Sequence, residues 1–399
     1  MKTEPDFIYR RVFGFLLFIL LFAYEVRAQQ PSSGELEVYT DFLKSQQTSA
    51  KDYIISLFDR YDIVVLCERD HREITQYDLI LEILKDDRFA TVRNASFEIG
   101  TTPNNKALNA FIHDKSLSKE QVGRTALHLQ RNSYGAALWE KANYIYYLQG
   151  VHEINRNLPA DRQIEISGLD IGVDWNTATQ ADIRMRDSLV SHARDSQLAA
   201  NFIRIYGRLD SPRKSLVVLN YRHALLKDLF GRKNAGRYIA NAYPGKVANV
   251  YINSFALDRN AETHKTEIVA LQDGKWDAAF LTAGKNNIGF DFEGSPFGND
   301  RLDIIPFKNN YTFSEFFTGF VYYNFFPNLR TVTGIDGFID DQFAPELMRR
   351  YELEQKVYGN ELPTISELKN NYNTVIDRIY KENKDEFGKA TDMIDKWMK

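Results

Sequence analysis

Short apolar segments separated by long helical patterns constrain the fold of this 399-residue chain more than any other feature. Each segment is rich in β-branched or aromatic residues, has the length of a strand and is bounded by polar or turn residues. Strands that alternate with helices require crossover connections, which favour parallel pairing with helices packed on the sheet. The sequence therefore predicts an α/β fold with a mixed, largely parallel sheet flanked by helices. The predicted strands are Asp62–Cys67, Asn94–Gly100, Ile164–Asp170, Ser215–Asn220 and Val247–Phe255.

The segments between and after these strands organise the rest of the chain. Residues 105–157 are expected to form a helical insertion, and a second long helix is expected over residues 177–206. From residue 258 onward we expect antiparallel strands at a sheet edge, with a hairpin turn at Gln272–Trp276. Without a Pro-rich linker or an internal repeat, we predict one α/β domain over residues 29–344 and a helical C-terminal extension over residues 345–399.

The first 28 residues have the pattern of a secretory signal peptide. Arg10 and Arg11 precede an apolar stretch at residues 12–24, and the VRA segment at residues 26–28 supplies a cleavage site. An apolar core of about 13 residues is short for a membrane-spanning helix, which needs about 20. We therefore predict export to the periplasm or the extracellular space and a mature chain that begins near Gln29. The alternative is an uncleaved N-terminal anchor.

The composition argues against several classes of partner. The formal net charge is −4 and no long basic block occurs, so neither nucleic acid nor an anionic membrane surface is expected to bind.

The single cysteine, Cys67, cannot form an internal disulfide and is predicted to be a buried core thiol, with a catalytic thiol as the less favoured alternative. The aromatic run at Phe316–Phe326 is predicted to belong to the core or, alternatively, to line an apolar pocket. The sequence gives no indication of an oligomeric state.

Ionisable or strongly polar side chains lie at the ends of four predicted strands. In an open parallel sheet, ligands bind beyond the carboxyl ends of the strands. One polar group at such a place is ordinarily a solvated surface residue, but four successive strand ends of this kind favour a shared site. We therefore expect His71 and His223 to face one cleft, with the carboxylates near them. The strand-end residues are Glu68 and His71, then Glu98, then Asp170, and finally Asn220, Arg222 and His223.

Two kinds of chemistry fit these residue types. A carboxylate beside an imidazole fixes its tautomer and raises its basicity, so His71, three residues after Glu68, is a candidate general base. His223 is then a candidate acid for the leaving group, and Arg72 or Arg222 is a candidate for stabilising an oxyanion. Alternatively, the two histidines and the carboxylates hold a divalent metal. The spacing alone does not decide between these chemistries.

The order of several motifs resembles that of the erythromycin esterase-like superfamily, whose relatives include the haem-uptake ChaN-like proteins and the Tiki/TraB proteins. The family has a Glu followed three residues later by a His after its first strand, acidic residues after the next strands, and an Asn-x-x-His at a late strand. The resemblance covers roughly residues 60 to 340. The matching segments are ERDH (68–71), SFEIG (96–100), SGLDIG (167–172), RMRDSLVSH (184–192), VVLNYRHALLKD (217–228) and IGFDFEGSPFG (288–298).

The resemblance implies hydrolysis of an ester, with a macrolide lactone as one candidate substrate. Together with the predicted signal peptide, this predicts a secreted hydrolase that acts on an ester or lactone of a small molecule, and no cofactor is predicted. A ChaN-like protein that binds haem or a divalent metal without catalysis is the alternative. A metal-dependent peptidase comes third, because ERDH is not the two-histidine helical zinc motif. The family usually has glycine before the Glu and a small residue or glycine after the His, where this chain has Cys67 and Arg72. A bulkier mouth to the site is therefore predicted, which argues against a macrolide substrate before it argues against hydrolysis. The motif residues carried over are Glu68, His71, Glu98, Asp170, Arg186 and His223.

Overall fold

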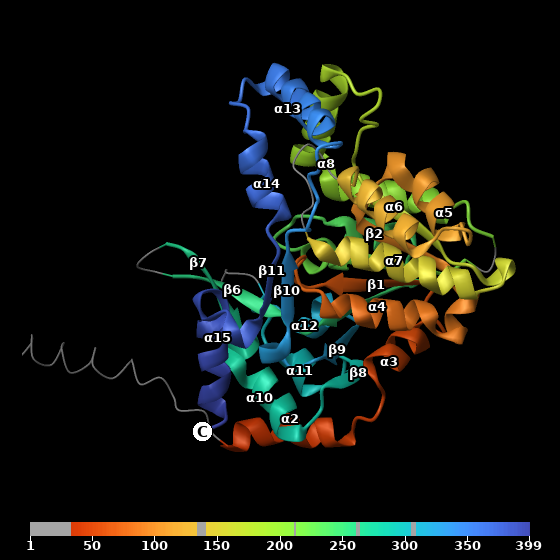
Figure 1. Ribbon diagram of the computed structural model, residues 1–399. Helices are drawn as coiled ribbons and strands as arrows, with labels where there is room; N and C mark the ends of the chain where they lie inside the picture. The colour runs from red at the N-terminus through yellow and green to blue at the C-terminus, as the bar shows by residue number, and fades with distance from the viewer. Residues whose placement is uncertain (1–32, 134–140, 211–212, 261–263, 305–308) are drawn as a thin grey trace, which may run out of the picture.

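A seven-stranded, largely parallel sheet forms the centre of the computed structural model (Figure 1), which describes residues 33–133, 141–210, 213–260, 264–304 and 309–399. The predicted signal peptide lies outside the described residues. The first six strands in the order below are parallel, and the last is an antiparallel edge strand. The predicted α/β class is therefore confirmed. The strand order is β3 (Glu165–Asp170), β2 (Asn94–Thr101), β4 (Ser215–Asn220), β1 (Ile63–Glu68), β5 (Val247–Ile252), β9 (Gly319–Tyr323) and β8 (Asn287–Asp291).

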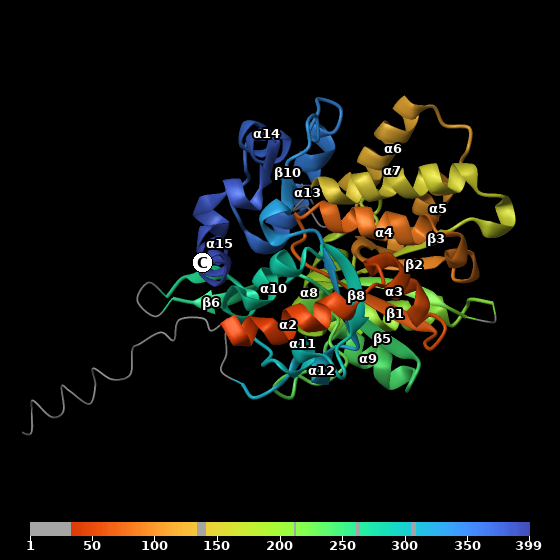
Figure 2. The same ribbon diagram turned by 90° about the horizontal axis from the view of Figure 1, so that it is seen from below.

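Two apolar cores cover the two faces of this sheet. Along β1, Ile63, Val65 and Cys67 contribute to one core, and Val64 and Leu66 contribute to the other, as the two-residue period of a strand requires. Figure 2 shows the sheet between the two helical layers. The first core packs against α2 (Ser33–Ser45), α8 (Gln180–Tyr206), α9 (Ala235–Ala242) and α10 (Lys275–Ala283). The second packs against α3 (Ala50–Leu57), α4 (Thr75–Lys85), α5 (Asn105–His113), α6 (Lys119–Arg131) and α7 (Ala142–Asn157).

Three sequence predictions within these layers can be compared with the structure. Cys67 is fully buried, as predicted for a core thiol. The aromatic run at Phe316–Phe326 supplies Phe320, whose ring packs with those of Trp276 and Phe297, so its assignment to the core is confirmed. The predicted helical insertion after the second strand is present as three helices, α5, α6 and α7.

The predicted hairpin turn at Gln272–Trp276 is wrong. The chain there forms the 3-10 segment η5 (Leu271–Gly274) and then enters α10. Gln272 and Asp273 have left-handed backbone angles that resemble a turn, but Trp276 and Phe280 follow at helical spacing and are buried in the core. The hairpin lies earlier, between β6 (Phe255–Arg259) and β7 (Thr266–Ala270), so the predicted fifth strand ends before Phe255.

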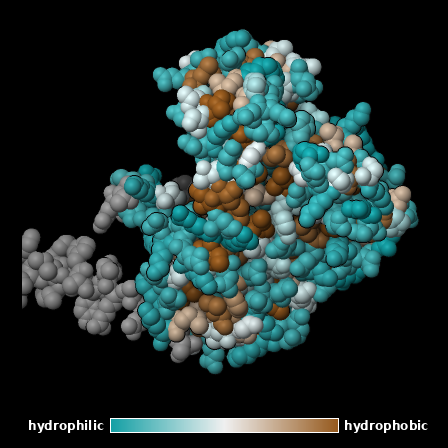
Figure 3. All heavy atoms as spheres, viewed as in Figure 1, coloured by the Kyte–Doolittle hydropathy of each residue, from teal (hydrophilic) through white to brown (hydrophobic). Residues whose placement is uncertain are grey.

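The C-terminal region is mainly helical, as predicted, but it also contributes a strand. It contains α13 (Ala344–Tyr358), α14 (Ile365–Asn373), β11 (Ile376–Ile379) and α15 (Lys384–Trp397). β11 pairs antiparallel with β10 (Arg330–Thr333), which ties this region to the α/β domain. Figure 3 shows hydrophobic side chains gathered below α13 and α14 on this face, and Val375 and Ile376 are among the exposed apolar residues of the segment.

None of the helices in the described residues is long and apolar enough to cross a membrane.

Candidate active site

The carboxyl ends of four adjacent strands bring the predicted polar residues together. Glu68 ends β1 directly opposite Asn220 at the end of β4, while Glu98 lies near the end of β2 and Asp170 ends β3. Asn220 connects these ends, because its backbone N–H donates to Glu98 Oε2 at 2.8 Å and its side-chain amide donates to the Arg69 carbonyl at 2.8 Å. The expectation that polar strand ends share one edge of the sheet is therefore confirmed.

A short hydrogen bond joins the first carboxylate to the first histidine. Nδ1 of His71 lies 2.6 Å from Glu68 Oε2, and the Tyr77 hydroxyl donates to Glu68 Oε1 at 2.7 Å. Burial lowers the pKa of His71, but the charge of Glu68 and this hydrogen bond outweigh burial and raise the pKa from 6.5 to about 9. The Glu68 carboxylate thus fixes the tautomer of His71, and Nε2 is the nitrogen that can exchange a proton with a substrate.

The loop that carries His71 is held from several sides. Gln76 accepts the Arg69 backbone N–H at 2.8 Å and donates to the Asp70 carbonyl at 2.8 Å. Asn143, at the start of α7, donates to the His71 carbonyl. The fully buried Arg69 pairs with Glu73 and donates to the Asn253 carbonyl. These bonds fix the loop backbone, so the His71 imidazole extends toward the strand ends from a rigid support.

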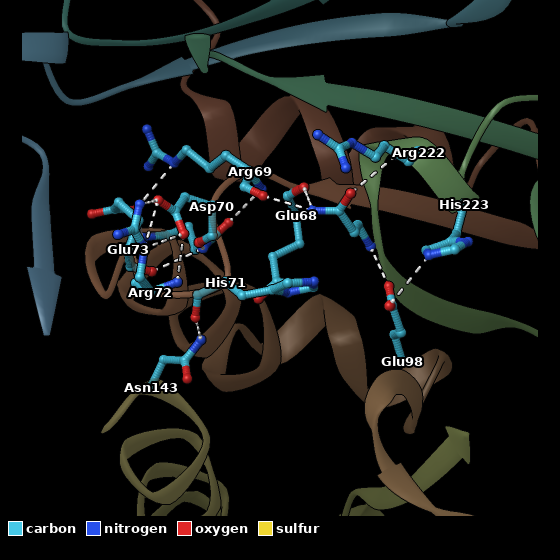
Figure 4. Close-up of polar contacts among 12 residues, drawn as sticks. Glu68, Arg69, Asp70, His71, Arg72, Glu73, Glu98, Asn143, Arg222 and His223 are labelled. Carbon is cyan, nitrogen blue, oxygen red and sulfur yellow. Dashed lines mark hydrogen bonds and ion pairs between the residues drawn. The ribbon is translucent and has the colours of Figure 1, made fainter. Parts of the chain in front are cut away.

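The second histidine has a carboxylate partner of its own. Nδ1 of His223 lies 2.8 Å from Asp195 Oδ1, and its Nε2 lies 3.6 Å from Glu98 Oε1. Burial lowers the pKa of His223, but the charge of Glu98 and the Asp195 contact outweigh burial and raise the pKa. Figure 4 shows His71 and His223 on opposite sides of Glu98, so the two histidines face one site, as predicted.

The guanidinium of Arg194 lies among the buried carboxylates and the second histidine. It donates to Asp170 Oδ2 at 2.8 Å and to Glu98 Oε1 at 3.0 Å, and its Nη1 lies 3.0 Å from Nε2 of His223. In this geometry His223 accepts from Arg194 through Nε2 and donates through Nδ1–H to Asp195. A protonated His223 would instead direct Nε2–H toward Glu98.

Glu98 is the electrostatic centre of the site. Burial raises the pKa of Glu98, but the charges of the two histidines and Arg194 outweigh burial and lower the pKa from 4.5 to about 2. The carboxylate is therefore ionised at every pH at which the protein is expected to work. A fixed negative charge between two imidazoles favours their protonated forms.

Two glycines of the recognised motifs explain how β2 carries Glu98 to this place. The register of β2 against β3 shifts between Phe97 and Thr101, and Gly100 has a φ of 103°. A Cβ on Gly168 would lie 2.3 Å from the Gly100 carbonyl carbon. Only glycine permits this close approach of the two backbones. The irregularity directs the end of β2 at the site, which is a common use of a β-bulge.

Arg186 is the one motif residue carried over from the resemblance that the structure places elsewhere. Its guanidinium pairs with Asp187 at 2.6 Å and with Glu354 at 2.9 Å and stands over the Trp175 ring. The reason is a repeated Arg-Asp pair in α8, because Arg194 follows Arg186 by eight residues, or about 12 Å of helix. The second pair reaches the strand ends, and the first pair contacts α13.

Three residues of the site were missed by sequence reasoning. Arg194 and Asp195 belong to the second Arg-Asp pair of α8, and that repetition is the signal that would have identified them. Tyr77 is a buried residue of the amphipathic helix α4, and its hydroxyl supports Glu68. An apolar periodicity does not distinguish a core tyrosine from one whose hydroxyl reaches a functional carboxylate.

The two arginines considered for an oxyanion differ in their availability. The guanidinium of Arg72 is bound to Asp70 and, at 2.6 Å, to Glu386 of α15. It therefore lies away from His71 and does not form the bulky mouth that its position in the sequence predicted. Arg222 is exposed, and its guanidinium contacts only the neighbouring Tyr221 among the described residues. Figure 4 shows Arg222 on the β4 side of the same cluster.

The donor set does not fit a bound metal ion. Within the described part of the chain, no three His, Cys, Asp or Glu side chains are grouped so that they could hold one. The carboxylates of Glu98 and Asp170, which would have to supply oxygen ligands, instead share the Arg194 cation. A divalent cation at that place would have to displace a guanidinium that already neutralises both groups.

The chain matches no family model and no curated protein. Solved structures with a similar fold include a Bacillus cereus protein, with 11% identity and a TM-score of 0.47 over 73% of this chain and 98% of that one. A succinoglycan biosynthesis protein has 10% identity and a TM-score of 0.44 over 74% of this chain and 98% of that one. A mutant of the erythromycin esterase EreC, in its open conformation, has 10% identity and a TM-score of 0.42 over 74% of this chain and 94% of that one. These identities and TM-scores are too low to assign a function.

Proposed function

We propose that this protein hydrolyses an ester or lactone, with His71 as the general base. The observation that supports the proposal most strongly is the 2.6 Å contact between Glu68 and His71 at the carboxyl edge of a parallel sheet. A second carboxylate–imidazole pair, Asp195 and His223, lies across Glu98 from the first. Each pair holds Nδ1 of its imidazole, so each Nε2 is the nitrogen suited to proton transfer.

In the proposed reaction, Nε2 of His71 takes a proton from a water molecule whose oxygen attacks the ester carbonyl. The carbonyl π electrons move to the oxygen, and the exposed guanidinium of Arg222 stabilises that negative charge. Protonation of the leaving group requires Arg194 to move its Nη1 away from Nε2 of His223 while it stays paired with Glu98 and Asp170. His223, then protonated at Nε2, gives its proton to the departing alkoxide as the C–O bond breaks. The products are a carboxylic acid and an alcohol, and the cycle closes when His71 loses its proton to solvent and His223 takes one up from solvent.

The proposed secretion rests only on the basic, apolar and small residues of the first 28 positions. It is checked in the same experiment as the activity, because the protein assayed should be the one recovered outside the cytoplasm. Its N-terminal sequence should begin near Gln29. Soluble cytosolic protein that retains Met1 would contradict this part of the proposal.

The activity is tested with a panel of chromogenic esters and lactones, with and without a chelator. The wild-type protein should hydrolyse at least one of them in both conditions. His71→Asn should fold normally and lose at least about a hundredfold in rate, the usual scale of acid–base catalysis. His264→Asn is the matched control, because His264 is exposed and has a φ of 56°, which asparagine tolerates, so its rate should match the wild type.

Elemental analysis of the same proteins separates catalysis from binding. Stoichiometric metal in the wild type that disappears in His71→Asn would make His71 a ligand and overturn its role as a base. If the wild type hydrolyses no member of the panel but binds metal or haem, the binding protein predicted as the alternative is the correct assignment.

A further inference from the structure

A hollow of about 690 Å³ opens beside the second histidine. We call it the basic hollow. Asp195, which holds Nδ1 of His223, lines it from α8, and Arg222, the residue before His223, lines it from the end of β4. The rest of its wall comes from the segment between β4 and α9. The hollow is therefore continuous with the residues that hold His223. The proposed reaction assigns no role to the hollow itself.

The charged side chains of the basic hollow are predominantly cationic. Arg222, Arg232 and Lys233 line it, and all are exposed. Within the described residues none of these three cations forms an ion pair, whereas the nearby Arg237 pairs with Asp228 at 3.0 Å. The one lining carboxylate, Asp195, is already engaged, because its Oδ1 accepts from both His223 and the Ala235 backbone N–H. The hollow therefore has unneutralised positive charge.

The wall of the basic hollow is also apolar. Leu225 is buried, Leu229 is partly buried, and Phe230 is 51% exposed. Reciprocal backbone hydrogen bonds between Leu229 and Arg232 close a two-residue turn in which Phe230 has a φ of 50° and Gly231 a φ of 74°. Asparagine or glycine is the usual residue at the first of these positions, and a bulky side chain there is strained. The strained turn places an aromatic ring at the hollow.

We propose that the basic hollow binds the anionic end of the substrate, so that the substrate class is an ester that has a carboxylate and an apolar chain. The inference rests on the proposed ester hydrolysis. Arg232 and Lys233 bind the carboxylate, and Leu225, Leu229 and Phe230 contact the chain. Arg222, between the hollow and the strand ends, marks the direction in which the ester reaches the two histidines. A cationic or neutral substrate would bring no negative charge for Arg232 and Lys233 to bind.

The inference is tested with two esters of similar size, mono-para-nitrophenyl glutarate, which is anionic, and para-nitrophenyl butyrate, which is neutral. The wild type should have the higher kcat/KM for the anionic ester, and added salt should reduce that preference, because it screens exposed charges. The double variant Arg232→Gln and Lys233→Gln should reduce the anionic-to-neutral ratio of kcat/KM about tenfold. Lys227→Gln is the control, because Lys227 is exposed in the same segment but does not line the hollow.

Binding is measured separately by calorimetry with decanoate and with 1-decanol, which have the same chain length. Decanoate should bind more tightly, and the double variant should lose about tenfold in affinity for decanoate. If esters are hydrolysed but neither the ester ratio nor decanoate binding changes in the double variant, the inference is wrong and the proposed function stands. If decanoate binding behaves as expected but no ester is hydrolysed, the proposed function is wrong and the anion site stands.

Discussion

At the scale of single residues, the short contact between Glu68 and His71 determines how the proposed reaction depends on pH. Because the pKa of His71 is raised to about 9, only about 1% of this imidazole is neutral at pH 7. The neutral form is a strong base, so the proposed mechanism combines high intrinsic basicity with a small active fraction. The same contact would also suit His71 to act as an acid in its protonated form. In that role the reaction rate would fall as the pH rises.

The pH profile of kcat/KM decides between these roles. With His71 as the base, kcat/KM should rise with pH to an inflection near pH 9 and then form a plateau that ends where His223, the proposed acid, loses its proton. Glu68→Gln removes the charge that raises the pKa, so its inflection should move down toward 6.5, with a lower plateau. Both profiles are measured with one ester at a saturating and a subsaturating concentration. A falling limb near pH 9 in the wild type that moves to lower pH in Glu68→Gln would show that protonated His71 is the active form.

Residue-level prediction succeeded where a side chain directly follows a buried strand. Glu68 and Asp170 are fixed by strand ends, and the sequence locates strand ends well because the apolar runs stop there. Arg194 and Asp195 lie in the middle of a 27-residue helix, where no local pattern tells which turn reaches the strand ends. The helix has a second Arg-Asp pair at Arg186, and only the packing of α8 on the sheet distinguishes the two.

At the scale of elements, the close approach of β2 and β3 positions Glu98. Gly168→Ala places a Cβ 2.3 Å from the carbonyl carbon and 2.4 Å from the oxygen of Gly100, and backbone atoms cannot rotate away. We expect a loss of stability of about 1–3 kcal/mol, typical of overpacking, and a loss of esterase activity because β2 shifts. Chemical denaturation and the ester assay measure both.

A second glycine provides the control for this substitution. Gly123 lies within α6, and the nearest atom to a Cβ there would be the Gln149 amide nitrogen at 3.9 Å. Gly123→Ala should leave activity unchanged and raise stability by up to about 1 kcal/mol, because alanine has the higher helix propensity. Equal stability for Gly168→Ala and the wild type would contradict the role assigned to the close approach.

Most elements of the sheet were predictable because strands buried on both faces are nearly continuous apolar runs. Two of the elements that were missed lack that signal. β11 has an IDRI sequence and exposed side chains, and it is a strand only because it pairs with β10. The turn residues at Gln272–Gly274 begin a helix because Trp276 and Phe280 are buried in the core. Both outcomes depend on tertiary contacts that a local pattern does not contain.

At the scale of the whole molecule, buried polar contacts as well as the apolar cores hold the helices to the sheet. The Tyr322 hydroxyl of β9 donates to Asp277 Oδ1 of α10 at 2.7 Å, and both side chains are fully enclosed. Burial raises the pKa of Asp277 from 3.8 to about 7, and the Tyr322 hydrogen bond opposes that shift only in part. The protonated carboxyl is therefore the form that the folded protein favours.

This contact predicts how the free energy of unfolding of the whole protein depends on pH. Between about pH 4 and pH 7, Asp277 ionises in the unfolded chain but stays protonated in the folded one, so its contribution to stability falls by about 1.4 kcal/mol per pH unit. Above pH 7 the contribution is constant. Asp277→Asn keeps an acceptor for Tyr322 but cannot ionise, so its stability relative to the wild type should increase from pH 5 to pH 7 and then remain level. Urea denaturation at pH 5, 6, 7 and 8 measures this difference, with the exposed Asp41→Asn as the control that should follow the wild type. A difference between Asp277→Asn and the wild type that is the same at all four pH values would show that the buried carboxyl does not govern stability in this range.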